Sequence, residues 1–525
     1  MKVTGLAVLA LVALLGGARA EGLQVKTTNG VIEGFATNEA DIWMGIPYAL
    51  PPVDNLRWQN PEPMTNWPGV REAKSFGPAC PQKCELPPLA CQDQISEDCL
   101  YLNVFAAKNV RNASVLVWIH GGRFEQGSEG VELYDARYIA NFSNTVVVTI
   151  NYRLGVLGFL TLPSGFIGNY ALRDQRLALQ WVQANIARFG GNPDQVTIFG
   201  QSAGGTSVSA HLTSERSYGL FSGAIIQSSP YALPLLKTED AYGHYDHFVQ
   251  ETDCQSASDT ACLLNLSWHE VIDAEISAQA KLYLERPLIM FFPWTPVIDG
   301  YELTTDPLTA INRGEHAKVP IVIGNVAEEA WIFVFTAFPK LNKLEAEALI
   351  DVIFRNHDEP KGIYDLYKIP DQADDYRPWI SEVATDFIML CTSRNASAAW
   401  EKSGMPVYRY EFNHSWSMKG AWGPANACCE GHACHGVELP FVFDSANLLN
   451  YTFDDGEQVL ARDITTAWGV FANTFSPNAN GLPQWPQNKP SEDDAILWYS
   501  SVDTQVKTQF RKKFCDFWDA QGYIF

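Results

Sequence analysis

A serine flanked by glycines is the residue whose surroundings best suit it for chemistry. It is Ser202, within the run 196–205, Val-Thr-Ile-Phe-Gly-Gln-Ser-Ala-Gly-Gly. The four leading residues predict a buried strand, and the Gly-x-Ser-x-Gly that follows predicts a sharp strand-to-helix turn where a larger side chain would clash. Such a turn exposes the hydroxyl and points the N–H groups of the next helix at the reacting group. The motif therefore indicates a nucleophile, which needs a base, an acid and an oxyanion hole from elsewhere in the chain.

Other apolar runs predict the strands that would carry this turn. Four of them have the length and composition of buried strands, and a fifth alternates in the manner of a strand: 115–119, 146–150, 223–227, 321–323 and 97–105. They alternate with helical segments along the chain. The sequence therefore predicts an α/β fold, with a large central, mostly parallel sheet covered by helices on both faces.

The helix expected just before the serine strand covers 174–189. Its apolar residues recur at the 3.6 spacing, Asp174 can cap its start, and Gly190 can end it. Nearer the N-terminus, 25–35 predicts a small hairpin that turns at Asn29-Gly30. Three prolines within 44–52 forbid a helix and predict an extended, packed loop.

The first twenty residues have the pattern of a secretory signal. Lys2 precedes an apolar run over 6–15, and Ala18-Arg19-Ala20 is a cleavage site of the A-x-A type. The alternative is a membrane anchor, but the run is short for a bilayer span. No linker or repeat divides the remainder, so we expect 1–20 to be a signal peptide and 21–525 a single domain with long insertions.

Composition points to the same compartment. The net charge of −23, from 37 basic and 60 acidic residues, argues against binding nucleic acid or an anionic membrane. Eleven cysteines suit an oxidising space. Six glycosylation sequons begin at Asn112, Asn141, Asn265, Asn395, Asn413 and Asn450. We therefore expect a secreted protein, or one in the lumen of the secretory pathway, with no membrane anchor.

Two stretches resemble the signatures of one family. They are 189–204, which reads Phe-Gly-Gly-Asn-Pro-Asp-Gln-Val-Thr-Ile-Phe-Gly-Gln-Ser-Ala-Gly, and 97–105, which reads Glu-Asp-Cys-Leu-Tyr-Leu-Asn-Val-Phe. On these residues the chain resembles the type-B carboxylesterase and lipase family, which includes the cholinesterases and has the α/β-hydrolase fold. The likeness covers nearly the whole mature chain.

The resemblance implies a Ser-Glu-His triad. Ser202 would be the nucleophile, and His435, in a His-Gly-x-Glu-Leu-x-Phe-x-Phe stretch, would be the base. The family's acid lies five residues after a strand-ending glycine, which from Gly324 gives Glu329. The neighbouring Glu328 remains an alternative. The chain order Ser–Glu–His is that of the α/β-hydrolase fold.

The resemblance also places the oxyanion hole. The expected residues are Gly121, Gly122 and Arg123 in one loop and Ala203 after the nucleophile. Arg123 departs from the family, which has a third glycine there, and Ala330 departs from the glycine that follows the acid. Either the backbone at Arg123 keeps its geometry with the side chain turned away, or the hole is narrower and activity is reduced.

Disulfides and buried contacts are implied in the same way. The family's pairs correspond to Cys80–Cys99, Cys254–Cys262 and Cys391–Cys515, and Cys84–Cys91 could nest inside the first. Cys428, Cys429 and Cys434 leave one odd thiol. Read alone, the Cys-Cys-x-x-His-x-Cys-His run could bind a metal, but its spacing is wrong for the usual zinc motifs, so we expect a disulfide and no metal. The implied structural contacts are ion pairs Arg57–Glu97 and Arg153–Asp174 and a hydrogen bond from Ser228 to the acid.

Two departures argue against a choline ester as substrate. Leu89 stands where cholinesterases have the tryptophan that binds choline, and Gln201 stands where they have glutamate. Met290, Phe292 and Trp294 resemble the acyl-pocket region, where bulky residues would favour short acyl chains. Ordinary core packing explains these three residues equally well.

Taken together, the residues and the resemblance predict a secreted serine hydrolase. It would cleave a small carboxylic ester through an acyl-enzyme, without a cofactor, and could form a homo-oligomer. The alternative is a catalytically weak or silent adhesion or secretory structural protein on the same fold. A lipase with a long acyl tunnel is a third interpretation.

Overall fold

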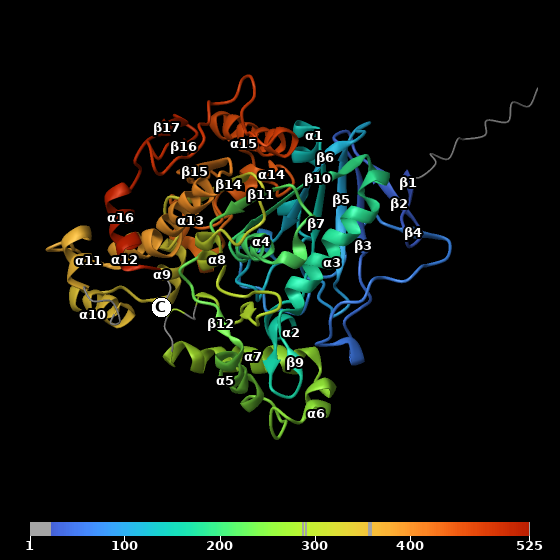
Figure 1. Cartoon of the computed structure of the whole chain (residues 1–525), viewed down its shortest axis with the longest axis horizontal. Coiled ribbons are helices and arrows are strands. Elements are labelled where there is room, and N and C mark those ends of the chain that lie inside the picture. The colour runs from blue at the N-terminus through green and yellow to red at the C-terminus, as the bar shows by residue number, and fades with distance from the viewer. Residues whose placement is uncertain (1–22, 286–287, 289–290, 355–359, 524–525) are drawn as a thin grey trace, which may run out of the picture.

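One sheet of 13 strands organises the described residues, which are 23–285, 288, 291–354 and 360–523 of a computed structural model (Figure 1). Its order is β1-β2-β3-β5-β7-β6-β10-β11-β14-β15-β16-β17, with β4 paired to β2. The strands are β1 Leu23–Lys26, β2 Val31–Ala36, β3 Ala40–Pro47, β4 Val70–Glu72, β5 Tyr101–Ala107, β6 Ala113–Ile119, β7 Val146–Ile150, β10 Gly191–Gln201, β11 Gly223–Gln227, β14 Ile321–Val326, β15 Val407–Phe412, β16 Ile496–Tyr499 and β17 Gln505–Lys507.

The remaining elements surround this sheet. Two short pairs are β8 Thr161–Leu162 with β9 Phe166–Ile167 and β12 Leu236–Lys237 with β13 Val297–Ile298. The helices are α1 Arg137–Ser143, α2 Gly155–Phe159, α3 Tyr170–Asn185, α4 Ala203–Thr213, α5 Thr238–Gln250, α6 Thr260–Asn265, α7 Trp268–Glu285, α8 Pro307–Arg313, α9 Trp331–Ala337, α10 Lys343–Ile353, α11 Pro360–Tyr367, α12 Arg377–Thr385, α13 Cys391–Lys402, α14 Leu439–Phe443, α15 Asp455–Thr474 and α16 Lys512–Gln521.

The centre of the sheet is parallel and buried on both faces. From β7 through β6, β10, β11, β14 and β15 to β16, every neighbouring pair is parallel. The outer pairs are antiparallel, except that β4 pairs in parallel with β2. Along β6, Val117 packs into one core and Trp118 into the other. Such continuous apolar strands are expected only where helices cover both faces. The mostly parallel α/β sheet predicted from the sequence is confirmed.

Different helices cover the two faces. On one side α3, α4 and α13 contribute to the core that contains Val117, and on the other α1, α14 and α15 contribute to the core that contains Trp118 (Figure 1). Ser202 lies between β10 and α4, so the nucleophile candidate sits where the sheet meets its covering layer.

Most predicted elements are present, with two corrections. The strands at 146–150 and 223–227 have the predicted bounds, and the hairpin with its turn at Asn29-Gly30 forms between β1 and β2. The predicted helix begins four residues earlier, at Tyr170, and Asp174 is not its cap. The Asp174 carboxylate is buried and pairs with Arg153 at 2.7 Å. Part of the expected loop 44–52 is strand β3, because an edge-proximal strand tolerates a proline at its end.

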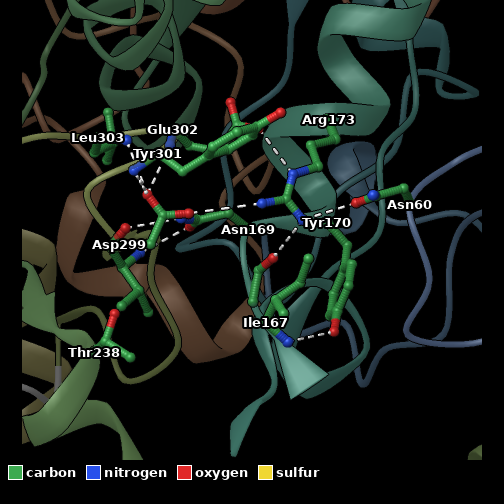
Figure 2. Close-up of polar contacts among 12 residues, drawn as sticks. Asn60, Ile167, Asn169, Tyr170, Arg173, Thr238, Asp299, Tyr301, Glu302 and Leu303 are labelled. Atoms are coloured by element: carbon green, nitrogen blue, oxygen red, sulfur yellow. Dashed lines mark hydrogen bonds and ion pairs between the residues drawn. The ribbon is translucent and has the colours of Figure 1, made fainter. Parts of the chain in front are cut away.

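A buried polar network fixes the segment that follows Phe292 and Trp294 (Figure 2). Asn169 exchanges two hydrogen bonds of 2.8 Å with the backbone of Val297. Arg173, one turn along α3, pairs with Glu302 at 2.8 Å and lies 3.6 Å from Asp299. Because these partners are more than 120 positions apart in sequence, the network ties the 295–303 loop to the helix before the nucleophile strand.

Covalent and ionic links agree with those implied by the resemblance. The disulfides are Cys80–Cys99, Cys84–Cys91, Cys254–Cys262, Cys391–Cys515 and Cys429–Cys434. Cys428 is the free cysteine among the described residues. Arg57 and Glu97 pair at 2.6 Å, largely buried. Within the described part of the chain, no helix combines the length and hydrophobicity needed to cross a bilayer. The proposed signal peptide, 1–20, lies outside the described residues.

Candidate active site

Ser202 occupies a strained turn between β10 and α4. Its backbone has φ 59° and ψ −122°, a region that residues with a side chain rarely adopt. The flanking glycines allow the close approach that this turn needs. A Cβ on Gly204 would lie 2.0 Å from the carbonyl oxygen of Ile119, and one on Gly200 would lie 2.6 Å from the Gly204 backbone. The sequence thus produces the expected elbow because glycine is the only residue that fits at both sides.

His435 and Glu329 lie together beside this turn. The Nδ1 atom of His435 is 2.5 Å from Oε2 of Glu329, and the glutamate side chain is fully buried. A carboxylate on Nδ1 fixes the imidazole as the tautomer that carries its proton there, which leaves Nε2 as the proton acceptor. This is the orientation that a general base next to a serine requires.

Glu328, the alternative acid, faces a different histidine. Its Oε1 is 2.9 Å from Nδ1 of His432, and its Oε2 accepts a 2.7 Å hydrogen bond from the backbone N–H of Ala433. Its side chain is about one-third exposed, whereas that of Glu329 is buried. The two neighbouring carboxylates therefore belong to separate carboxylate–histidine pairs. The geometry favours Glu329 as the acid that orients His435.

Backbone and amide groups of β14 hold the Glu329 carboxylate. Oε1 accepts hydrogen bonds from the N–H of Val326 at 2.9 Å and from Nδ2 of Asn325 at 3.4 Å. The expected bond from Ser228 is wrong, since its hydroxyl makes no hydrogen bond to any described residue. Asn325 was missed at the sequence level, although its position four residues before the acid is a signal that could have identified it.

The side chain of Gln201 contacts Nε2, the second ring nitrogen of His435. Its Nε2 lies 3.0 Å from Nε2 of His435. With the ring proton on Nδ1, the amide donates and the ring nitrogen accepts. The residue that precedes the serine therefore contacts the same nitrogen that a serine hydroxyl would use.

The glycine loop after β6 lies against the nucleophile. A Cβ on Gly121 would be 3.1 Å from Cβ of Ser202, and Gly122 has φ 110°, where a Cβ would meet the carbonyl of Gln126 at 2.1 Å. Helix α4 starts at Ala203, so its first N–H groups have no partner within the helix. The loop and the helix end thus bring together the backbone expected for an oxyanion hole.

Arg123 adopts the left-handed backbone that the family's glycine would adopt more easily. Its φ is 62°, and its side chain reaches Glu125 at 3.1 Å and the Tyr283 hydroxyl at 3.2 Å. A positive φ is one that glycine adopts freely, and the guanidinium is anchored to α7. These observations favour the first of the two possibilities raised by the sequence. Left-handed backbone costs a residue with a side chain roughly 1–2 kcal/mol.

Buried carboxyls surround this anchor. Burial raises the pKa of Glu125 to about 7, although the nearby positive charge of Arg123 lowers this pKa. Burial and the charge of Glu125 raise the pKa of Glu275 to about 8. Glu275 accepts a 2.8 Å hydrogen bond from the N–H of Val156. The segment that carries Arg123 is therefore packed against groups that change charge near neutral pH.

His120 supports the start of the same loop. Its Nδ1 lies 2.8 Å from the carbonyl oxygen of Gly121, and its ring stacks on Tyr152 at 4.4 Å. Burial lowers the pKa of His120 to about 4, so the ring is neutral and Nδ1 donates to the carbonyl. The sequence shows this histidine before the glycines but does not reveal its role.

A cavity of about 700 Å³, partly open to solvent, joins these groups. Ser202, His435, Gln201 and the Gly121–Arg123 loop lie on its wall. The opposite wall is apolar and aromatic, made by Leu86, Leu89, Leu133, Tyr134, Ile332, Phe333, Trp416, Trp422 and Leu439. Such a lining suits a neutral organic group rather than a charged one.

A smaller cavity adjoins Ser202 on its other side. Ser202, Phe333 and Phe292 line it, together with Glu329. Of the predicted acyl-pocket residues, Phe292 is therefore brought to the serine. Trp294 is not among the described lining residues and packs, fully buried, against Tyr245 and His244. Met290 lies outside the described residues.

The cysteine-rich loop offers no metal ligand set in the described part of the chain. Cys429 and Cys434 are joined in a disulfide, and no group of three or more potential ligands gathers among the described residues. The loop instead holds His432 and His435 on either side of Cys434. The disulfide expected within this loop is confirmed.

Known proteins resemble the chain over almost its whole length. Residues 21–518 match the profile of the carboxylesterase family. The cAMP-regulated D2 protein of Dictyostelium discoideum is 37% identical, covering 92% of this chain and 90% of that protein. The crystal protein of the same organism is 35% identical, covering 95% and 91%. The solved structure of PNB esterase superimposes with a TM-score of 0.79 at 30% identity, covering 93% of this chain and 98% of that one.

Proposed function

The chain belongs to the carboxylesterase family and has the α/β-hydrolase fold, and from this we propose that it is a secreted serine hydrolase of small carboxylic esters. In this proposal Ser202 is the nucleophile, His435 the general base and Glu329 its orienting acid. Five disulfides among the described residues are consistent with maturation in the secretory pathway.

The proposed reaction uses two steps through an acyl-enzyme. The Ser202 hydroxyl attacks the ester carbonyl while His435 Nε2 takes its proton, and the tetrahedral oxyanion forms against the N–H groups of Gly122, Arg123 and Ala203. The imidazolium then gives the proton to the departing alcohol. Water hydrolyses the acyl-enzyme by the same route in reverse, and Glu329 stabilises the imidazolium in both steps.

One observation carries the proposal: the buried carboxylate of Glu329 lies 2.5 Å from His435, and that histidine shares a cavity wall with Ser202 in its strained turn. A protein with only a structural role would not need a strained serine, an oriented imidazole and a glycine loop in the same place. Their gathering at one cavity supports acyl transfer over a purely structural role.

The test is hydrolysis of a chromogenic acetate or butyrate ester by the mature protein. We expect a burst of one chromophore per protein, labelling of Ser202 by an organophosphonate, and loss of both in Ser202→Ala. Ser209→Ala is the matched control, because that serine lies about two turns further along α4 and bonds to the Tyr231 hydroxyl instead. Equal rates for the wild type and Ser202→Ala would refute the enzyme proposal.

The lining of the larger cavity bears on the substrate class. Leu89 is in its wall, and Gln201 supplies an amide where a carboxylate would attract a cation. Neither favours a quaternary ammonium. We therefore propose a neutral ester whose alcohol portion lies against Trp416 and Trp422.

A second candidate is a catalytically weak or silent member of the family with a structural or adhesive role. The observation in its favour is that His435 Nε2 is hydrogen-bonded to the amide of Gln201 rather than to the hydroxyl of Ser202. Phosphonate labelling separates the two candidates, since a silent protein would leave Ser202 unmodified at concentrations that label an active esterase.

A further inference from the structure

A second cavity opens at the carboxyl ends of β14, β15 and β16. It measures about 660 Å³, partly open to solvent, and shares no described lining residue with the cavity that holds Ser202. Residues of α9, of α12 and of the segment before α16 line it. Nothing in the proposed esterase reaction uses this space.

The cavity wall contains a buried carboxyl group with one oxygen that makes no hydrogen bond to a described residue. Glu411, on β15, is 1% exposed, and its Oε2 makes no hydrogen bond to any described residue. Burial raises the pKa of Glu411 to about 8, although the nearby positive charge of Arg409 lowers this pKa. Arg409 itself pairs with Asp494 at 3.3 Å. Leaving a buried carboxyl unpaired is costly, so its persistence in a cavity wall points to a partner from outside the chain.

The other charged groups in the wall are already satisfied. Arg511 pairs with Asp386 and, at 2.9 Å, with Glu382. Glu328 is bonded to His432 and to the backbone of Ala433. Besides Glu411, three carboxylates therefore face one guanidinium in this wall, so the excess charge is negative even while Glu411 is neutral. A ligand for this cavity should be a cation.

The aromatic part of the cavity wall can contact the carbon chain of a ligand. Trp498 and Phe510 meet edge to face at 5.1 Å and line the cavity near Glu411, which pairs in register beside Trp498. The chain's own Lys507 already places its ammonium 3.1 Å from the centre of the Trp498 ring. An ammonium ion with a carbon chain thus finds both the carboxylate and the aromatic surface that it needs.

We propose that this cavity binds a primary alkylammonium ion, whose ammonium group donates to Glu411 and whose carbon chain lies against Trp498 and Phe510. A primary ammonium has three N–H donors and can satisfy Oε2, whereas a quaternary ammonium has none. A hard metal ion would need several oxygen ligands, and the described residues hold no such group. The site extends the function of the chain beyond ester hydrolysis.

Binding of such an ion should release a proton below pH 8. Glu411 is neutral there, since burial and the nearby charges of Glu329 and Asp386 raise its pKa. The charges of Arg409 and Arg511 lower this pKa by less, so that it is about 8. The incoming ammonium favours the carboxylate, whose proton passes to the buffer. Proton release is a signature that nonspecific attraction to an acidic surface would not give.

The test is isothermal titration of the mature protein with n-butylammonium and 1,4-butanediammonium, neither of which is an ester. We expect saturable binding, release of up to one proton at pH 7, and a dissociation constant at least tenfold higher in Glu411→Gln. Tetramethylammonium should bind at least tenfold more weakly. Glu492→Gln is the matched control, because this exposed carboxylate pairs with Lys489 and does not line the cavity.

Three results would overturn the proposal. They are no heat of binding to the wild type, equal affinity in Glu411→Gln with an unchanged melting temperature, and equal affinity for tetramethylammonium. Trp498→Leu gives a second line of evidence if Glu411→Gln folds poorly, since it alters the apolar wall and leaves the carboxylate intact. Because neither titrant is an ester, the result does not depend on whether the chain hydrolyses esters.

Discussion

The side-chain amide of Gln201 lies 3.0 Å from Nε2 of His435, across 234 positions of sequence. The same nitrogen must accept a proton from Ser202 if the chain is an esterase. With the ring N–H on the side of Glu329, the Gln201 amide donates to Nε2 and thus competes with the serine for the same ring nitrogen.

Replacing Gln201 by glutamate should change the pH dependence of hydrolysis. A carboxylate at this distance favours the protonated imidazole, which cannot act as a base, so the acidic limb of the pH–rate profile should move up by about 1 unit. The measurement is kcat/KM for a short-chain ester between pH 5 and 9. Gln201→Leu, which removes the donor without adding charge, should leave the limb in place, and an unshifted profile in Gln201→Glu would contradict this role.

Removing the charge of Glu329 should impair hydrolysis far more than removing that of Glu328. Only Glu329 reaches His435, and loss of an orienting carboxylate in such triads costs about 10⁴-fold in kcat. We expect Glu329→Gln to lower kcat by about 10²–10⁴-fold, and Glu328→Gln by less than about tenfold. Steady-state kinetics of the two variants at one pH would distinguish the neighbours. The assignment fails if Glu328→Gln is the more damaged variant.

The protein should be more stable at pH 5 than at pH 8. Burial raises the pKa values of Glu125 to about 7, Glu275 to about 8 and Glu438 to about 7, from a usual value of 4.5. The folded state therefore holds protons that the unfolded chain has already lost above pH 4.5. Stability from these groups is complete below that value and is lost as pH rises through 7 to 8.

Thermal unfolding between pH 5 and pH 8 tests the predicted direction of this change in stability. We expect the melting temperature to fall from pH 5 to pH 8, and Glu275→Gln to reduce that fall by removing one titrating group. Glu270→Gln, an exposed position on the same helix, serves as the control. A melting temperature that rises between pH 5 and pH 8 would show that other groups dominate.

Loss of the longest disulfide loop should destabilise the fold most. Cys391 and Cys515 are 124 positions apart, whereas Cys84 and Cys91 are 7 apart. Loop-closure entropy gives about 5 kcal/mol for the former and about 2.4 kcal/mol for the latter. Equilibrium unfolding of the two Cys→Ser double variants should reproduce that order. The reverse order would mean that local packing, and not chain entropy, sets the contribution of these bonds.

Truncating Phe292 should lengthen the preferred acyl chain. Its ring lines the small cavity next to Ser202, so Phe292→Ala adds room where the acyl group would lie. Each methylene newly buried is worth about 0.8 kcal/mol, roughly fourfold in kcat/KM. A series of p-nitrophenyl esters from acetate to octanoate measures the shift. Phe142→Ala, on α1 against Arg462, is the control, and an unchanged chain-length profile in Phe292→Ala would remove this residue from the acyl pocket.

The sequence by itself determined the parts of the molecule that depend on near neighbours. Apolar runs fixed strands such as β7 and β11, because a buried strand needs only its own residues to be apolar. The glycines around Ser202 determined its turn, because the clashes they avoid involve the backbone at the turn and at the end of the adjoining strand.

Only the tertiary structure decided which groups meet. Glu328 and Glu329 are adjacent and chemically identical, yet the turn after β14 directs one to His432 and the other to His435. Likewise Cys434 pairs with Cys429 and leaves Cys428 free. The partners lie on segments that contact one another only after the sheet and its helices have packed. The spacing from Gly324 favoured Glu329 only through the family resemblance, and the residues around the two glutamates could not show which one meets His435. No local pattern could identify Gln201 as the partner of His435.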